Sequence, residues 1–233
     1  SVVGDMSTHV ATTHMVPMIM QFLKDEAPEV RQNALEKLDS VVTSCGADVV
    51  STSMIPVIAV LVSDPQWRVR ERVIEQLPLL ATTLGAEIFE EKLLLLYLSS
   101  YHDQVNAVRL AATRQLNPLT EALGASWTAA KLIPKLREVF HSGANYQQRI
   151  TILYALKQLC CIPSLVSNTS ELVSMIVSGG KDGVPNVRFV AAQFLADISE
   201  SGTVDPARIE SEIKGTLTEM TSDEDSDVVY FAT

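Results

Sequence analysis

The sequence is poor in cysteine, proline, glycine and aromatic residues, and these shortages exclude several classes of protein. Three cysteines, Cys45, Cys160 and Cys161, are too few for a disulfide framework, and reduced thiols are typical of cytosolic and nuclear proteins. Proline and glycine each occur 10 times among 233 residues, which excludes collagen-like and low-complexity chains. Hydrophobic residues nevertheless make up 47% of the chain, so we expect a folded core rather than disorder.

Basic residues and long apolar runs are also scarce. Lysine and arginine number 18 against 28 acidic residues, which gives a formal net charge of −10. Nucleic-acid binding needs clustered lysine and arginine, so we expect no nucleic-acid partner. The apolar run Leu93–Leu98 has six residues, whereas a membrane-spanning helix needs about 20. The first residues lack the basic and apolar regions of a signal peptide, so we also expect no membrane partner.

Motifs that carry chemistry are missing from the sequence. No HExxH, CxxC, GxSxG or GxGxxG string occurs. Four histidines are scattered along the chain, and none pairs with cysteine at metal-ligand spacing: His9, His14, His102 and His141. We therefore expect no metal, no cofactor and no enzymatic activity. For the adjacent Cys160 and Cys161, a structural role at a helix end is the preferred interpretation, and a redox pair is the alternative.

A pattern that recurs about every 40 residues is the strongest positive feature. Four Asp/Arg pairs have the same internal spacing, and Arg149 falls midway between the last two arginines. The glycines Gly46, Gly85 and Gly124 keep the same period. Independent columns with one period indicate a tandem repeat. The four pairs are Asp25/Arg31, Asp64/Arg70, Asp103/Arg109 and Asp182/Arg188.

The apolar spacing within each repeat predicts two helices. Apolar residues three, four and seven apart predict a helix B that begins after the aspartate and ends near the glycine. A shorter helix A precedes it, and we expect such helices at 53–61, 87–98, 128–140 and 165–177. Two helices in about 40 residues indicate a HEAT repeat, because armadillo units contain three helices.

The predicted fold is therefore all-α, a HEAT-repeat α-solenoid of antiparallel helix pairs that forms one domain over residues 1–233. Residues 1–8 look like the end of an earlier helix B, and the last helix B is short. We accordingly expect a piece of a longer solenoid. The six expected units cover about 9–46, 47–85, 86–124, 125–163, 164–202 and 203–233.

Particular strings carry a closer resemblance. Residues 28–39, 117–136 and 185–198 resemble the C-terminal HEAT repeats of the scaffold (A) subunits of protein phosphatase 2A. The most specific string is QWRVRERVIEQLPLLA at residues 66–81, because generic HEAT proteins share the aspartate and Val-Arg columns but not these residues. The resemblance covers nearly the whole chain. One departure is Ser142-Gly143-Ala144, which stands in the fourth unit where the others have aspartate.

The resemblance implies a non-catalytic scaffold. In that family, the turns between helix A and helix B hold the phosphatase catalytic subunit in the C-terminal repeats. They hold a variable regulatory subunit in the N-terminal repeats, which this sequence lacks. The implied location is cytoplasmic, with the nucleus as a second location. Another HEAT adaptor, such as a nuclear-transport receptor, is the alternative, and the regular step of the repeat argues against it.

The recurring aspartate and arginine have two interpretations. The preferred one is a structural ladder, in which each arginine bonds the aspartate of its own or a neighbouring unit, because charge-assisted bonds need a fixed geometry. The alternative is a charged strip that binds a partner. The fourth unit lacks the aspartate, so Arg149 is expected to bond a backbone carbonyl or another acid.

One column at the start of helix B is the candidate partner-binding edge. A large aromatic side chain in a solvent-facing first turn covers little core, and protein interfaces concentrate binding energy in tryptophan, tyrosine and arginine. In the resembled family, the Trp-Arg of this turn contacts the catalytic subunit. The alternative is that the rings pack on the neighbouring turn. The candidate residues are Trp67, Arg68, Asn106, Tyr146, Pro185 and Asn186.

Overall fold

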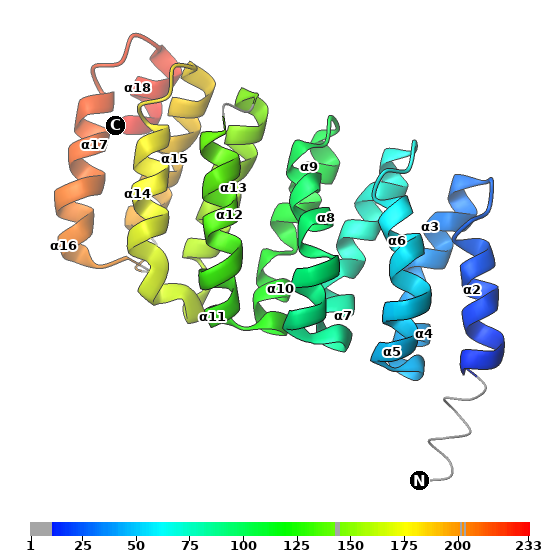
Figure 1. The fold of residues 1–233 in the computed structure, drawn as a ribbon. Helices are drawn as coiled ribbons and strands as arrows, with labels where there is room; N and C mark the ends of the chain where they lie inside the picture. The colour runs from blue at the N-terminus through cyan, green and yellow to red at the C-terminus, as the bar shows by residue number, and fades with distance from the viewer. Residues whose placement is uncertain (1–10, 143–144, 201, 203) are drawn as a thin grey trace. The chain divides into compact units, whose positions relative to one another are not determined.

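The structure is a computed structural model of the chain, and it describes residues 11–142, 145–200, 202 and 204–233. Every regular element in these residues is a helix or a helical turn, as the sequence predicts (Figure 1). The chain divides into two compact units, Ser1–Gly124 and Ala125–Thr233. The division falls between the third and fourth of the six expected repeats.

The first compact unit contains three helix pairs, with the turns from helix A to helix B at one end of the pairs (Figure 1). Its first pair consists of η1 (Ala11–Met15), α2 (Val16–Phe22), α3 (Pro28–Glu36) and α4 (Leu38–Cys45). The rest consists of α5 (Ala47–Val49), η2 (Val50–Met54), α6 (Ile55–Leu61), α7 (Trp67–Lys92), α8 (Leu94–Ser99), η3 (Ser100–His102), α9 (Asn106–Arg114) and α10 (Leu116–Leu123).

The second compact unit repeats this arrangement. Its first pair consists of α11 (Ala125–Trp127), η4 (Thr128–Leu132), α12 (Ile133–His141) and α13 (Tyr146–Cys160). The others consist of η5 (Pro163–Asn168), α14 (Thr169–Gly179), α15 (Pro185–Glu200), α16 (Pro206–Arg208), η6 (Ile209–Ile213), α17 (Lys214–Met220) and α18 (Ser226–Ala232).

Helix A begins earlier than the sequence pattern predicts and contains a π-helical turn. In the second repeat the apolar spacing predicts residues 53–61, but the chain is helical from Ala47. The π turn η2 ends just before Pro56, which occupies the second position of α6. Proline lacks an N–H and crowds the carbonyl four residues back, so the chain widens there instead of breaking. Pro17 and Pro134 follow η1 and η4 in the same way.

Positive-φ glycines follow helix B, as predicted. Gly46, Gly85, Gly124 and Gly202 have φ of 79°, 76°, 92° and 70°. Beyond the adjacent backbone, no atom lies within 4 Å of the place that a Cβ would occupy on any of them, so backbone conformation rather than space requires glycine. Gly85 lies inside α7, which therefore holds a complete helix B and the start of the next helix A.

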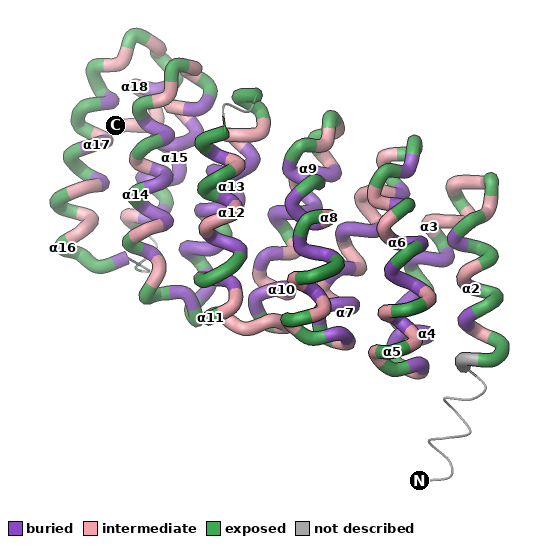
Figure 2. Tube along the Cα trace, viewed as in Figure 1, coloured by how far each residue is buried: buried purple, intermediate pink, exposed green. Residues whose placement is uncertain are grey.

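The core of each unit lies between its helices. Figure 2 shows buried residues on the facing sides of neighbouring helices and exposed residues on the outer sides. The leucine seven residues after each repeat arginine is completely buried, with 0% exposure at Leu38, Leu77, Leu116, Leu156 and Leu195. Burying each such side chain contributes about 1.5–3 kcal/mol to the free energy of folding. This column of leucines therefore stabilises the packing of each helix B in its unit.

No single helix among the described residues is long and apolar enough to span a membrane. One pair, Tyr146–Cys160 with Pro163–Gly179, meets the requirements of length and composition together, and it is bent by 114°.

Candidate protein-binding edge

The ladder aspartates hold the turns that precede helix B. Asp25, Asp64 and Asp103 each accept, through Oδ1, the backbone N–H two residues further on, at 2.9, 2.8 and 2.8 Å. Asp182 and Asp223 do the same at 2.9 Å. As the sequence pattern predicts, helix B begins after the aspartate, and in the first repeat it begins at Pro28. The carboxylate therefore shapes the turn that precedes the helix.

The ladder arginines bridge two successive turns. Arg31 donates through Nη1 to the carbonyl oxygen of Asp25 at 2.7 Å, and its Nε lies 2.8 Å from Oδ2 of Asp64. Arg70 repeats this with the carbonyl of Asp64 at 2.8 Å and the carboxylate of Asp103 at 2.6 Å. Each arginine therefore joins its own turn to the turn of the following repeat.

The second compact unit contains the same bridges. Arg149 donates Nε and Nη2 to the two carboxylate oxygens of Asp182, at 2.6 and 2.9 Å. Arg188 donates to the carbonyl of Asp182 at 3.0 Å and to both carboxylate oxygens of Asp223, at 2.7 and 2.8 Å. The acid that Arg149 bonds is thus the ladder aspartate of the following repeat.

Arg109 differs from the other arginines. The residue at the ladder position of the next turn is Ser142 rather than aspartate. The Arg109 guanidinium donates to the carbonyls of Asp103 and Gln104, at 2.8 and 3.1 Å, and to Oδ1 of Asn106 at 3.1 Å. Arg109 is only 5% exposed, and this burial lowers its pKa while the charge of Asp103 opposes the shift.

The bridges stabilise the charged forms of the ladder aspartates. Burial raises the pKa of Asp103, but hydrogen bonds from Arg70 and the Val105 amide outweigh it and leave the pKa below its ordinary value. The pKa of Asp182 is lowered in the same way. For Asp223, the hydrogen bond from Arg188 is the main cause of the lowered pKa. These pairs are shielded, with only 10–19% of each side chain exposed.

The predicted edge residues share a structural position. Trp67, Asn106, Tyr146 and Pro185 are the first residues of α7, α9, α13 and α15. Trp67, Arg68 and Asn106 belong to the first compact unit, and Tyr146, Pro185 and Asn186 belong to the second. Arg68, Asn106 and Asn186 are exposed, as is 38% of Tyr146, whereas Trp67 and Pro185 are half-buried.

Trp67 and Arg68 contact each other at the second turn. The Arg68 guanidinium carbon lies 4.4 Å from the centroid of the Trp67 ring. This is a cation–π contact. Trp67 also lines a groove of about 600 Å³ between the second and third turns, together with His102 and Asp103. The ring thus contacts Arg68 and also borders the groove.

The described residues hold no cluster of three or more histidine, cysteine or acidic side chains that could bind a metal ion. Among the histidines, His9 lies outside the described residues. Cys160 is buried and Cys161 is exposed. Burial, followed by the charge of Cys161, raises the pKa of Cys160 to about 12, so the Cys160 thiol is a poor nucleophile at neutral pH.

Comparison with known proteins agrees with the repeat. A family model described as HEAT repeat matches residues 15–45. A segment of 92 residues is 40% identical to the regulatory A subunit of protein phosphatase PP2A from Saccharomyces cerevisiae (strain ATCC 204508 / S288c). The chain is similar to this yeast PP2A protein. This confirms the resemblance that the sequence strings indicate. The match covers 38% of this chain and 14% of the yeast protein.

Solved structures show the fold alone. A chain of the Pds5–Scc1 complex matches all of this chain and 37% of its own length, with a TM-score of 0.64 and 13% identity. The structure of Cex1p matches 95% of this chain and 43% of its own length, with a TM-score of 0.59 and 15% identity. The predicted helical-repeat solenoid is therefore confirmed, and these distant matches carry no functional information.

Proposed function

We propose that this chain is a non-catalytic scaffold of a type 2A serine/threonine protein phosphatase and binds the catalytic subunit through its A–B turns. The observation that carries the proposal is the 40% identity over 92 residues to the yeast PP2A protein. The variable regulatory subunit would bind mainly to repeats outside this sequence. The proposed locations are the cytoplasm and the nucleus.

The ladder suits a scaffold because it ties consecutive turns together. Each bridge in the first unit fixes one turn to the next through two kinds of bond, carbonyl and carboxylate. Side chains at the first position of helix B are therefore presented at a set spacing within each unit. A rigid surface loses little conformational entropy when a partner binds. Holding two proteins on one scaffold also raises the effective concentration of each toward the other.

Trp67 and Arg68 are the best candidates for the centre of the contact. The guanidinium is stacked on the ring, and Arg68 has no salt-bridge partner among the described residues. Its N–H groups are therefore available to a carboxylate or carbonyl of the catalytic subunit. Removing such a Trp–Arg pair from an interface can weaken binding by about 2–4 kcal/mol.

The test titrates the immobilised chain with purified catalytic subunit on a biosensor. The double variant Trp67→Ala with Arg68→Ala should raise Kd by about 30-fold or more, because 1.4 kcal/mol corresponds to about tenfold. A matched control removes one apolar and one basic residue from helix A, Leu95→Ala with Lys92→Ala. Unchanged binding by the Trp67/Arg68 variant would place the contact elsewhere. Phosphatase activity of the chain on its own would contradict the non-catalytic assignment.

A further inference from the structure

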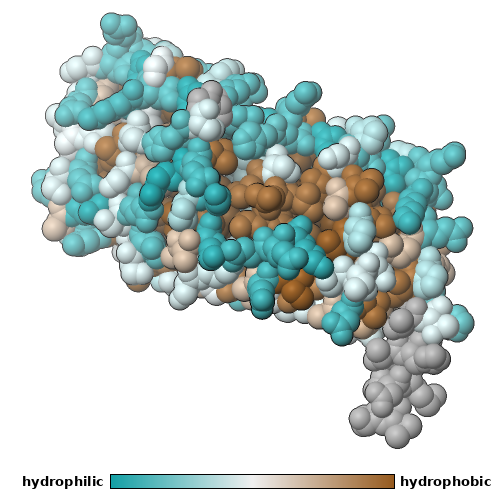
Figure 3. Space-filling view, viewed as in Figure 1, coloured by the Kyte–Doolittle hydropathy of each residue, from teal (hydrophilic) through white to brown (hydrophobic). Residues whose placement is uncertain are grey.

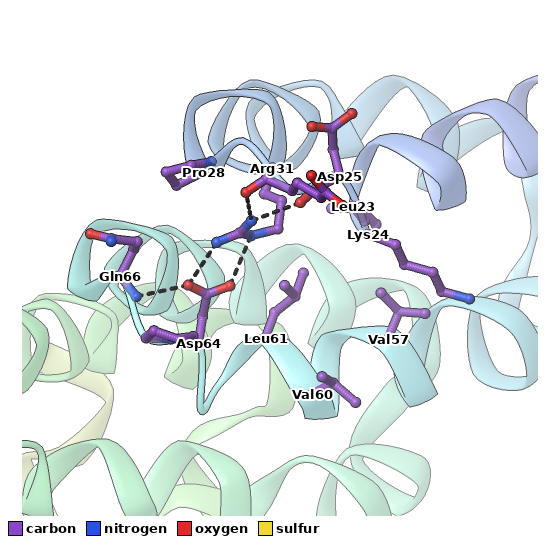
Figure 4. A pocket seen from close by; sticks show the side chains of 12 residues that line it. Leu23, Lys24, Asp25, Pro28, Arg31, Val57, Val60, Leu61, Asp64 and Gln66 are labelled. Carbon is purple, nitrogen blue, oxygen red and sulfur yellow. Dashed lines mark hydrogen bonds and ion pairs between the residues drawn. The ribbon is translucent and has the colours of Figure 1, made fainter.

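The first two A–B turns of the first compact unit border an apolar groove that the Trp67 edge does not use. The groove has a volume of about 650 Å³ (Figure 4), within the usual range for ligand pockets. Its floor is formed by Leu23, Val57 and Leu61, and Val60 lies on its rim. The Arg31–Asp64 pair closes one end (Figure 4).

Val60 departs from the repeat pattern at its position. It is 71% exposed on α6. The residues one repeat before and after it are Gln21 and Ser99, both exposed and polar. Figure 3 shows apolar surface over α6 and α8, on the side of the helices A. Because the repeat itself places polar residues in this column, packing does not explain a valine here.

The neighbouring groove provides an internal comparison. The groove between the second and third turns has the same position in the repeat and a volume of about 600 Å³. Three of its lining residues are Ser63, Ser99 and His102. In the preceding repeat, the corresponding residues are Lys24, Val60 and Ser63, in that order. The two grooves are therefore equivalent in the fold, but only the first has an apolar rim residue at the Val60 column.

One cation borders the apolar part of the groove. Lys24 extends toward Val57, away from Arg31 and Asp64 (Figure 4). Its ammonium has no ion-pair or hydrogen-bond partner among the described residues. The backbone carbonyl oxygens of the two residues that follow it, Asp25 and Glu26, accept from Arg31, which closes one end of the groove. The unpaired ammonium of Lys24 therefore lies next to the apolar floor of the groove.

We propose that this groove binds a short segment of a partner protein that carries a large apolar side chain next to an acidic residue. The apolar side chain covers Val57, Val60 and Leu61, and the carboxylate pairs with the ammonium of Lys24. This proposal is independent of the function proposed above, because it uses none of the Trp67 edge residues.

The test selects peptides with the full chain as bait. A phage library of random heptapeptides is panned on the chain, and recovered peptides are synthesised with a fluorescent label for polarisation titrations. Val60→Gln places in the groove the residue that the preceding repeat carries, so it should leave the fold intact. Lys24→Glu reverses the charge. Leu95→Gln is the matched control, since Leu95 is 73% exposed on α8 and does not line the groove.

The expected peptides combine a leucine, methionine or phenylalanine with an adjacent aspartate or glutamate. Val60→Gln and Lys24→Glu should each weaken their binding at least tenfold, and Leu95→Gln should not. Replacing the acid of the peptide by lysine should restore binding to the Lys24→Glu chain. The proposal is overturned if no recovered peptide depends on Val60, or if Val60-dependent peptides lack an acid. Val60-dependent self-association in sedimentation experiments would also overturn it, because a second copy would then be the occupant.

Discussion

Arg70 grips Asp103, in the turn of the following repeat, with two parallel bonds, Nε to Oδ2 at 2.6 Å and Nη2 to Oδ1 at 2.8 Å. The same guanidinium donates to the carbonyl of Asp64, in its own turn. Asp103 in turn accepts the amide of Val105. Each member of this pair also holds the backbone of its own turn, and the bonds between them link the two turns. Removing the pair should therefore affect both turns.

Breaking this pair should destabilise the first compact unit. Asp103→Asn removes the negative charge but leaves an oxygen for the Val105 amide, and it leaves the Arg70 guanidinium, whose side chain is 15% exposed. An unpaired, partly buried charge of this kind costs about 3–5 kcal/mol. Urea denaturation followed by circular dichroism should show the loss. The control is Lys214→Ala, which breaks an exposed pair with Glu210. A loss as small as that of the control would show that the ladder is dispensable.

Low pH should destabilise the folded protein by protonating the ladder aspartates. The pKa values of Asp103, Asp182 and Asp223 are lowered in the folded protein, whereas the pKa of aspartate in an unfolded chain is about 3.9. The unfolded state therefore binds more protons in this range. The contribution of these residues is fully present above about pH 5 and is lost as the pH falls below about 4. Urea midpoints measured across this range should fall less steeply for Asp182→Asn, and an unchanged slope would contradict this origin.

The regular parts of the fold follow from the sequence because they depend on periodic local rules. Helix B, its terminal glycine and the buried leucine column each follow from spacing alone, and Leu77 and Gly85 show this in one helix. The π turn before Pro56 does not follow, because local rules treat a proline as a boundary. The chain accommodates it with a wider turn instead.

The direction of the ladder could not be predicted from spacing. In a perfect repeat, the spacing from an arginine to the aspartate of its own turn recurs together with the spacing from that arginine to the aspartate of the next turn. Both pairings therefore fit the sequence equally. In the structure, Arg70 bonds the backbone carbonyl of Asp64 in its own turn and the carboxylate of Asp103 in the next turn. From the second repeat on, each ladder carboxylate is bound by the arginine of the preceding repeat. The serine at position 142, where the other repeats have aspartate, therefore affects Arg109 and not Arg149 of its own repeat. The arginine whose next turn has no ladder aspartate is Arg109, which bonds Asn106, whereas Arg149 bonds both carboxylate oxygens of Asp182.

A buried tyrosine pair should be a sensitive point of the first compact unit. Tyr97 and Tyr101 are 0% exposed, their hydroxyl oxygens are 3.0 Å apart, and Tyr97 donates to the carbonyl of Ala112 at 2.7 Å. Tyr97→Phe removes the hydroxyl that bonds this carbonyl and the Tyr101 hydroxyl, and the loss of these two buried bonds should cost about 1–3 kcal/mol. Tyr154→Phe, at a position that is 40% exposed, is the control. Equal urea midpoints for the two variants would show that the buried network contributes nothing.

The same pair should ionise only when the protein unfolds. Burial raises the pKa of Tyr97 and Tyr101 well above the ordinary value for tyrosine. Absorbance at the tyrosinate band should therefore rise late in an alkaline titration, together with the loss of helical circular dichroism. Tyr97→Phe should reduce this late step, and a step that precedes unfolding would contradict the burial.

Gly85 should tolerate a side chain poorly even though it has open space around it. Its φ of 76° lies in a region that residues with a Cβ rarely adopt, although nothing would contact that Cβ within 4 Å. Gly85→Ala should therefore lower the free energy of unfolding by about 1–2 kcal/mol through backbone strain. Urea denaturation of the variant and the parent chain measures the difference.

Gly183→Ala is the matched control for this backbone effect, since Gly183 also has open space but no positive φ. It should change stability by less than about 0.5 kcal/mol. Because the two variants add the same methyl group to equally open positions, a difference in their urea midpoints isolates the cost of the positive φ. Equal midpoints would mean that the chain between helix B and the next helix A can adopt another conformation at no cost.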